Sequence, residues 1–193
     1  MKQNLLTTDD ILKLKAIVLY IVNKCGEIDI YHLLKIIYFA DREHYAQWGT
    51  RLTADNYCAM ENGPVASNLY DALKAVTSNK FHLKGDSELH LIADSLYKVD
   101  QEFNYFIGAK EPADMDELAA SDITCLNHSI EENLKSTFGE LSKKSHDEAW
   151  LTAYTYKKNS IIDTLLMAKA GGASEDTLNY IRENEEINSM LAI

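Results

Sequence analysis

Two clusters of polar residues in this sequence have the side chains that acid–base or metal chemistry uses. Asp41 and His44 lie three residues apart in an apolar segment, a spacing that places both on one face of a helix. They could supply two ligands to a metal ion, but a zinc site needs three or four, and no spaced Cys or His pair offers the rest. A metal-dependent hydrolase that uses Asp41 and His44, or His146 later in the chain, is therefore one hypothesis, and a structural hydrogen bond to Asp41 is the favoured one.

The second cluster is His146, Asp147 and Glu148. Consecutive residues of a helix or turn point in different directions, so these three do not converge easily on one substrate, and their order is not that of His-Glu-x-x-His. We interpret His146 as a residue that satisfies a local turn, with Trp150 packed beneath it. The sequence also has no glycine-rich phosphate loop and no nucleophile elbow. We therefore predict no catalytic residues, no metal and no cofactor, and the argument moves from catalysis to binding.

The charge of the chain bears on what it can bind. The net charge is −11, and residues 97–193 carry nine basic and eighteen acidic side chains, whereas residues 1–96 carry ten and twelve. Nucleic-acid binding depends on cations placed against phosphates, so we expect no direct nucleic-acid contact. The acidic half favours a basic protein partner, or it simply keeps the protein in solution.

Cysteine usage and hydropathy predict a cytoplasmic protein. Cys25, Cys58 and Cys125 are odd in number and widely separated, so they form neither a zinc motif nor a disulfide framework. The longest apolar run, residues 16–22, is too short to cross a bilayer, and the pattern of an export signal is missing. We expect no membrane association.

A long helix from Ile30 to Trp48 is predicted to position Asp41. Its apolar residues recur at helical spacing, and Asp41 falls near the middle of the apolar stripe. Burying a bare carboxylate costs several kcal/mol, so Asp41 must have partners. The candidates are backbone amides of the following segment, residues 49–62, or the side chains of His44 and Tyr57. We interpret Asp41 as a brace that holds this segment in place.

The segment ends in Asn62, Gly63 and Pro64. Glycine permits a positive backbone angle, and proline suits the first position of a helix, where no amide hydrogen is needed. The pattern therefore predicts a helix over residues 65–76. Three residues beside Asp41 and this turn are expected to be exposed and to contact a partner: Arg51, Asn56 and Glu61.

Several short motifs resemble, in order and spacing, those of the Panacea domain, which is the SocA-like antitoxin domain and is also met as the phage-associated GepA family. The most specific part is residues 31–74, and the Ser145–Trp150 segment is similar to the family's Thr-His-then-Trp segment. The motifs that carry the resemblance are Tyr38-Phe39-Ala40-Asp41, Trp48-Gly49, the run from Thr53 to Tyr57, and Gly63-Pro64-Val65 followed by Leu69-Tyr70-Asp71-Ala72-Leu73.

The resemblance implies one domain over residues 1–193 that neutralises a cognate toxin, encoded by an adjacent gene, through direct binding. In the SocA branch it further implies an adaptor that hands the toxin to a bacterial protease. A phage-associated structural or regulatory module without a toxin is a third hypothesis.

The fold class that we predict is α+β and mainly α-helical, with helices packed around a core and a small antiparallel sheet of three or four short strands. Strands are expected at Tyr57–Met60, in a hairpin formed by residues 81–84 and 88–92, and at 96–99. Further helices are expected over residues 8–24, over 121–134 and from Ser160, and the helical half over residues 121–186 is acidic.

Overall fold

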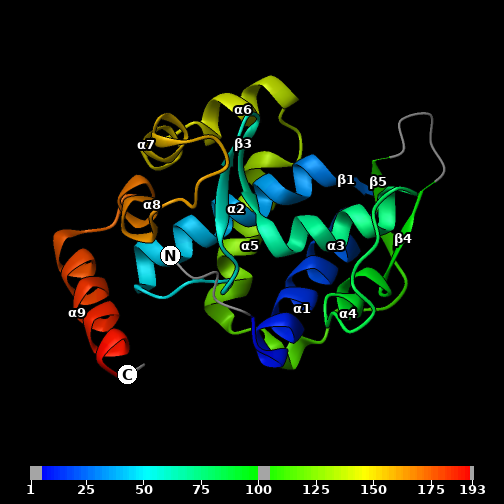
Figure 1. Cartoon of the computed structure of the whole chain (residues 1–193), viewed down its shortest axis with the longest axis horizontal. Coiled ribbons are helices and arrows are strands. Elements are labelled where there is room, and N and C mark those ends of the chain that lie inside the picture. Colours follow the sequence, from blue (N-terminus) through cyan, green and yellow to red (C-terminus); the bar gives the residue numbers. More distant parts are fainter. Residues whose placement is uncertain (1–5, 100–104, 192–193) are drawn as a thin grey trace.

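The computed structural model describes residues 6–99 and 105–191. The protein is mainly helical, with a small three-stranded antiparallel sheet and a separate two-stranded hairpin, which confirms the predicted fold class. Helix α2 lies at the centre and contacts α1, α5, α6, α8 and α9 as well as the hairpin (Figure 1). The helices are α1 Thr8–Cys25, α2 Ile30–Trp48, α3 Ser67–Thr77, α4 His90–Ala93, α5 Ala120–Asn133, α6 Phe138–Ser145, α7 Glu148–Tyr156, α8 Thr164–Ala170 and α9 Glu175–Leu191, with a short 3-10 helix at Met115–Glu117.

Helices α1 and α2 form where the sequence places them, because both carry clear start and stop signals. Thr7 caps α1 in a reciprocal capping box with Asp10, and Asp29 caps α2 by accepting a hydrogen bond from the amide of His32. Gly49, in the left-handed conformation, ends α2. The apolar faces of both helices contribute to one core. Trp48 is an exception, because 55% of its surface is exposed although its position falls on the apolar stripe.

The strands come from segments that lie far apart in the sequence. In the three-stranded sheet, β1 (Ile28–Asp29) and β4 (Leu96–Lys98) pair with opposite edges of β5 (Phe106–Ala109). The hairpin joins β2 (Tyr57–Met60) to β3 (Gly63–Ala66).

The segment before α8 extends the hairpin. The amide of Asn159 donates a hydrogen bond to the carbonyl of Ala59, and the amide of Ile162 donates one to the carbonyl of Tyr57. The segment that leads into α8 is thereby attached to β2.

The predicted hairpin is wrong, and so are two predicted helix starts. The hairpin expected over residues 81–84 and 88–92 does not form: residues 81–87 hold no strand, and residues 90–93 are helical because Ile92 and Ala93 pack together against α1 and α3. A short apolar run does not distinguish a strand from a buried helical turn. The strand expected at 96–99 is confirmed as β4, and its partner β5 comes from a stretch that has no clear strand pattern.

Two helices begin later than the sequence predicts. Pro64 lies in β3, and α3 begins at Ser67, because residues 63–66 pair with β2. Residues 160–162 likewise extend along β2, so α8 starts at Thr164 with Asp163 as its cap. Within residues 6–99 and 105–191, no helix combines the length and the hydrophobicity that a membrane span requires.

Candidate functional site

Asp41 is the centre of a hydrogen-bond network that fixes the segment after α2. Its carboxylate is fully buried and accepts hydrogen bonds from the amide of Leu52 (2.7 Å) and the hydroxyl of Thr53 (2.8 Å). Arg51 donates two more, from Nε (2.9 Å) and Nη2 (2.7 Å). The expected partners included a backbone amide of this segment, and the amide of Leu52 fulfils that expectation. Of the other candidates, His44 contacts different groups, and the buried hydroxyl of Tyr57 has no hydrogen-bond partner among the described residues.

Arg51 belongs to this network, so the expectation that it is exposed is wrong. Only 18% of its side chain is accessible. Burial opposes the charge of the guanidinium, but the Asp41 carboxylate outweighs that effect and holds the pKa of Arg51 above its usual range. Arg51 also donates to the carbonyl of Asp55 and lies 5.2 Å from the ring of Tyr57. The long side chain of Arg51 extends back to Asp41, which lies ten residues earlier in the sequence.

Asp55 is a second buried carboxylate, which the sequence motifs do not single out. It is 1% exposed and accepts hydrogen bonds from the amides of Asn68 (3.2 Å) and Leu69 (2.9 Å). These amides belong to the first turn of α3, where the N-cap residue Ala66 has no side-chain oxygen to offer. Asp55 therefore caps α3 from outside and attaches it to the braced segment.

Asp147 performs the same task at α7. Its carboxylate accepts hydrogen bonds from the amide of Trp150 (3.0 Å), the hydroxyl of Tyr38 (2.7 Å) and Nη1 of Arg42 (2.8 Å). It thus caps α7 and ties that helix to α2. An Asp followed by a glutamate in the first turn is a helix-start signal, and that signal was available in the sequence.

The side chains of His146 and Trp150 pack against each other. Their rings are stacked with centroids 3.7 Å apart, and the amide of His146 donates to the carbonyl of Ser142 at the end of α6. The indole Nε1 of Trp150 donates to the carbonyl of Met60, 2.9 Å away. Burial, together with the nearby charge of Lys35, lowers the pKa of His146. This pair therefore supports the hairpin.

His44 does not combine with Asp41 into a metal site. Its Nδ1 lies 2.8 Å from the carbonyl of Thr50, and its Nε2 lies 3.2 Å from the Asp122 carboxylate, which also pairs with Lys13. Across the residues that the structure describes, no group of three or more His, Cys, Asp or Glu side chains is arranged to hold a metal ion. The residues named in the hydrolase hypothesis are thus engaged in structural bonds.

Lys35 is an unexpected buried cation beneath the hairpin turn. Its side chain is fully buried in α2, and its Nζ donates to the carbonyl of Pro64 (2.9 Å). Desolvation lowers the pKa of Lys35 to about 7, and the charge of Asp147 opposes this shift only in part. The turn over Gly63 and Pro64 therefore rests on a group that titrates near neutral pH.

This burial predicts an unusual pH dependence of stability. Below pH 7 the ammonium of Lys35 is present in both states, and the folded protein bears the cost of burying it. Between about 7 and 10.5 the folded state loses the proton while the unfolded chain keeps it, so the free energy of unfolding rises with pH by up to about 1.4 kcal/mol per unit. Urea unfolding from pH 7 to 9 should show this rise in the wild type and a smaller one in Lys35→Met. Parallel curves for the two proteins would contradict it.

The hairpin turn forms one wall of an aromatic groove. The cavity has a volume of about 770 Å³ and is bounded by the start of α2, by β5 and by the start of α6. Tyr105 and Phe138 are 60% and 52% exposed. The residues that line the aromatic groove are Asp29, Ile30, Tyr31, Leu34, Met60, Glu61, Asn62, Val65, Tyr70, Tyr105, Phe106, Phe138 and Asn159.

The three residues expected to contact a partner are thus placed differently. Glu61 is exposed and lines the aromatic groove, Asn56 is half-buried and lies outside it, and Arg51 is bonded to Asp41. Contact of a partner with any of them stays a prediction.

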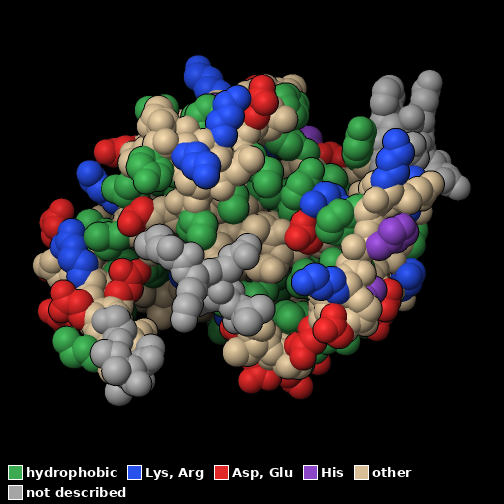
Figure 2. Space-filling model, viewed as in Figure 1, with side chains coloured by type: hydrophobic (Ala, Val, Ile, Leu, Met, Phe, Trp, Pro, Cys, Tyr) green, Lys and Arg blue, Asp and Glu red, His purple; other side chains and the backbone are tan. Residues whose placement is uncertain are grey.

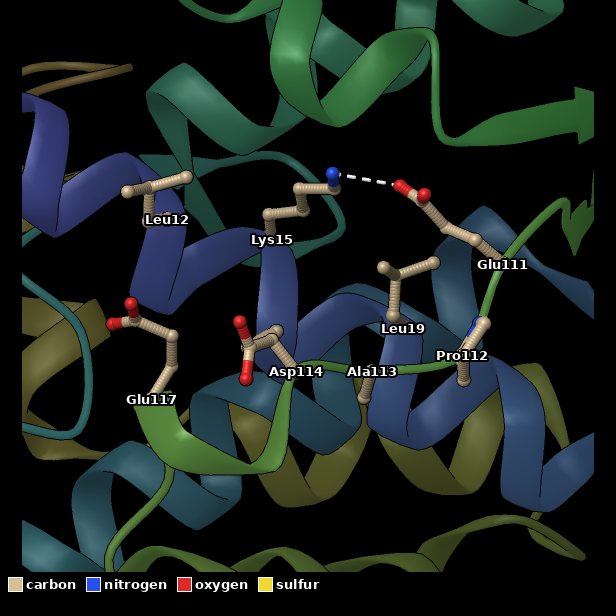
Figure 3. Close-up of a pocket in the computed structure, with 9 residues that line it drawn as sticks. Leu12, Lys15, Leu19, Glu111, Pro112, Ala113, Asp114 and Glu117 are labelled. Atoms are coloured by element: carbon tan, nitrogen blue, oxygen red, sulfur yellow. Dashed lines mark ion pairs between the residues drawn. The ribbon is translucent and has the colours of Figure 1, made fainter.

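A second depression, of about 380 Å³, lies between α1 and residues 111–117. Figure 3 shows Lys15 reaching across it to Glu111, with the two groups 2.6 Å apart, and Asp114 and Glu117 along the same wall. Because Glu111 neutralises Lys15, this depression presents an acidic surface. The residues that line it include no nucleophile–base pair.

The chain was compared with known protein families. The family model of the antitoxin SocA-like, Panacea domain matches residues 33–151, more than half of the chain. The chain belongs to this family. The matched part of this Panacea domain contains Asp41, Asp55 and Asp147, whereas all of α1, α8 and α9 lie outside it. Searches of curated proteins and of solved structures gave no match.

Proposed function

We propose that this Panacea domain is an antitoxin that neutralises a cognate toxin, encoded by an adjacent gene, through direct protein–protein binding. Membership of the SocA-like antitoxin family is the observation that carries the proposal. On this proposal the whole chain, residues 1–193, acts as one unit in the bacterial cytoplasm, without catalysis. Delivery of the toxin to a protease is an additional step that the same complex could support.

The braced structure supports a binding role. Asp41, Asp55 and Asp147 each fix the backbone at the start of a segment or helix, and their bonds converge on the hairpin and its neighbours. A surface that is ordered before binding loses less conformational entropy when the complex forms. The groups that could serve catalysis, namely His44 and His146, are already occupied by structural contacts.

Coexpression tests this proposal. The product of the adjacent reading frame should arrest bacterial growth when expressed alone, and coexpression of this chain should restore growth. The two proteins should also co-elute in size-exclusion chromatography. A toxic neighbour that this chain neither rescues nor binds would refute the proposal.

The adaptor step needs a separate measurement. The half-life of the toxin is compared in wild-type cells and in cells that lack a candidate cytoplasmic protease. If the chain is an adaptor, toxin degradation should require both the chain and the protease. Rescue with an unchanged toxin half-life would instead indicate that binding alone neutralises the toxin.

A further inference from the structure

We propose that the aromatic groove is the docking site for the toxin, and that it takes a toxin segment with an apolar anchor side chain next to a lysine or arginine. The inference rests on the proposed antitoxin function and adds to it the surface and the chemistry of recognition.

The groove has the size and the surface of a recognition site. A volume of about 770 Å³ lies within the usual range for ligand pockets and accommodates several side chains of a peptide segment. Phe138 packs on Tyr31 with ring centroids 4.4 Å apart, and half of its surface is still exposed. Tyr105 is more exposed still. Aromatic side chains at such positions contribute a large share of binding energy in protein interfaces.

One wall of the groove is held rigid from behind. The carbonyl of Met60 accepts the hydrogen bond from Trp150, and the carbonyl of Asn62 accepts one from the hydroxyl of Tyr31 (3.3 Å). The carbonyl of Pro64 accepts the bond from buried Lys35. Alternate carbonyls along the turn are therefore fixed by three side chains, one from α7 and two from α2. The groove keeps its shape without a ligand, which favours specific docking.

The charges at the groove indicate a basic partner. Among the described residues that line it are two carboxylates, Asp29 and Glu61, and no lysine or arginine. Asp29 is occupied by His32, with its carboxylate 2.6 Å from Nδ1. Glu61 is exposed and makes no hydrogen bond or ion pair within the described part of the chain. A cation entering here would meet Glu61 and the exposed rings of Tyr105 and Phe138, both of which attract it.

A second copy of this chain fits the groove less well than a basic protein. The net charge is −11, and Figure 2 shows acidic side chains gathered over α9 and near α1 and α4. Two such molecules repel each other, and a partner that carries lysine or arginine is attracted from a distance.

The test measures toxin binding by full-length variants that alter the groove. Glu61→Lys reverses the free carboxylate, and the double variant Tyr105→Ala/Phe138→Ala removes the exposed rings. The matched controls are Asp86→Lys, an exposed carboxylate that has no partner among the described residues, and Tyr156→Ala, an aromatic residue that is 87% exposed; neither lines the groove. Titration calorimetry with the purified toxin gives the dissociation constants, and thermal unfolding verifies that each variant is folded.

We expect each groove variant to weaken binding by at least about tenfold and each control to change it by less than about twofold. Reversal of one toxin lysine or arginine to glutamate should restore the affinity of Glu61→Lys.

If the wild type binds toxin and all variants bind equally well, the groove inference is wrong and the antitoxin function stands. If the wild type itself does not bind, the proposed function fails. A dimer of the chain alone that is lost in the Tyr105→Ala/Phe138→Ala variant would assign the groove to a second copy and would also overturn the inference.

Discussion

The Asp41→Asn variant is expected to lose about 3–5 kcal/mol of unfolding free energy, a large part of the stability of a domain of this size. Asparagine has nearly the same shape as aspartate, but it is neutral and one of its terminal groups donates instead of accepting. The substitution therefore leaves the guanidinium of Arg51 without its counter-ion, although only 18% of that side chain is accessible. Asparagine keeps only one oxygen, so either the amide of Leu52, which is bonded to Oδ1, or the hydroxyl of Thr53, which is bonded to Oδ2, also loses its buried acceptor.

Urea unfolding followed by circular dichroism measures this loss. The matched control is Asp71→Asn, since Asp71 is 46% exposed and its pair with Lys74 spans one turn of α3. Surface pairs of this kind contribute at most about 1 kcal/mol, so the control should remain close to the wild type. An Asp41→Asn protein within about 1 kcal/mol of the wild type would show that the brace does not stabilise the fold.

A double substitution separates the lost charge pair from other effects. Asp41→Asn/Arg51→Met removes both charges, so no uncompensated guanidinium is left inside the protein. We expect the double variant to be more stable than Asp41→Asn alone, because an unpaired buried charge costs more than the loss of the pair. Additive losses from the two substitutions would mean that Asp41 acts mainly through Leu52 and Thr53.

Local signals in the sequence predict the central helices and the burial of Asp41. Thr7 and Asp29 mark helix starts, Gly26 and Gly49 mark ends, and these signals act over a few residues. Asp41 is recognisable because a carboxylate on an apolar stripe must find a partner. Strands β2 and β4 were also predicted, but β1 and β5 gave no such signal, since β1 has two residues and depends on pairing with β5, about eighty positions away.

The partners of each side chain in the site depend on the fold and not on local pattern. Arg51 is a polar residue that follows a helix, and such a position predicts an exposed side chain. Only the fold shows that Asp41 lies opposite Arg51. Lys35 lies on α2, and no residue near it in the sequence predicts that the turn at Pro64 covers it. The groove combines residues from α2, the hairpin, β5 and α6, so only the assembled structure shows it.

Gly63→Ala is expected to destabilise the protein by roughly 2–5 kcal/mol through two separate effects. Gly63 has φ of +100°, a conformation that alanine adopts only at a cost. A Cβ atom at this position would also lie 2.5 Å from Oγ of Ser145 and 2.7 Å from Nζ of Lys35. Lys35 is buried and bonded to the carbonyl of Pro64, so it cannot withdraw without breaking that bond.

Gly172→Ala provides a control that carries only the first effect. Gly172 has φ of +88°, and a Cβ atom there would meet nothing within 4 Å. Its substitution should cost about 1–2 kcal/mol, the usual penalty for a left-handed residue. The difference in unfolding free energy between the two variants, measured in urea, then reports the packing of the hairpin turn against Lys35 and Ser145. Equal losses would show that this turn is loosely packed, and the rigid wall that the groove requires would have no support.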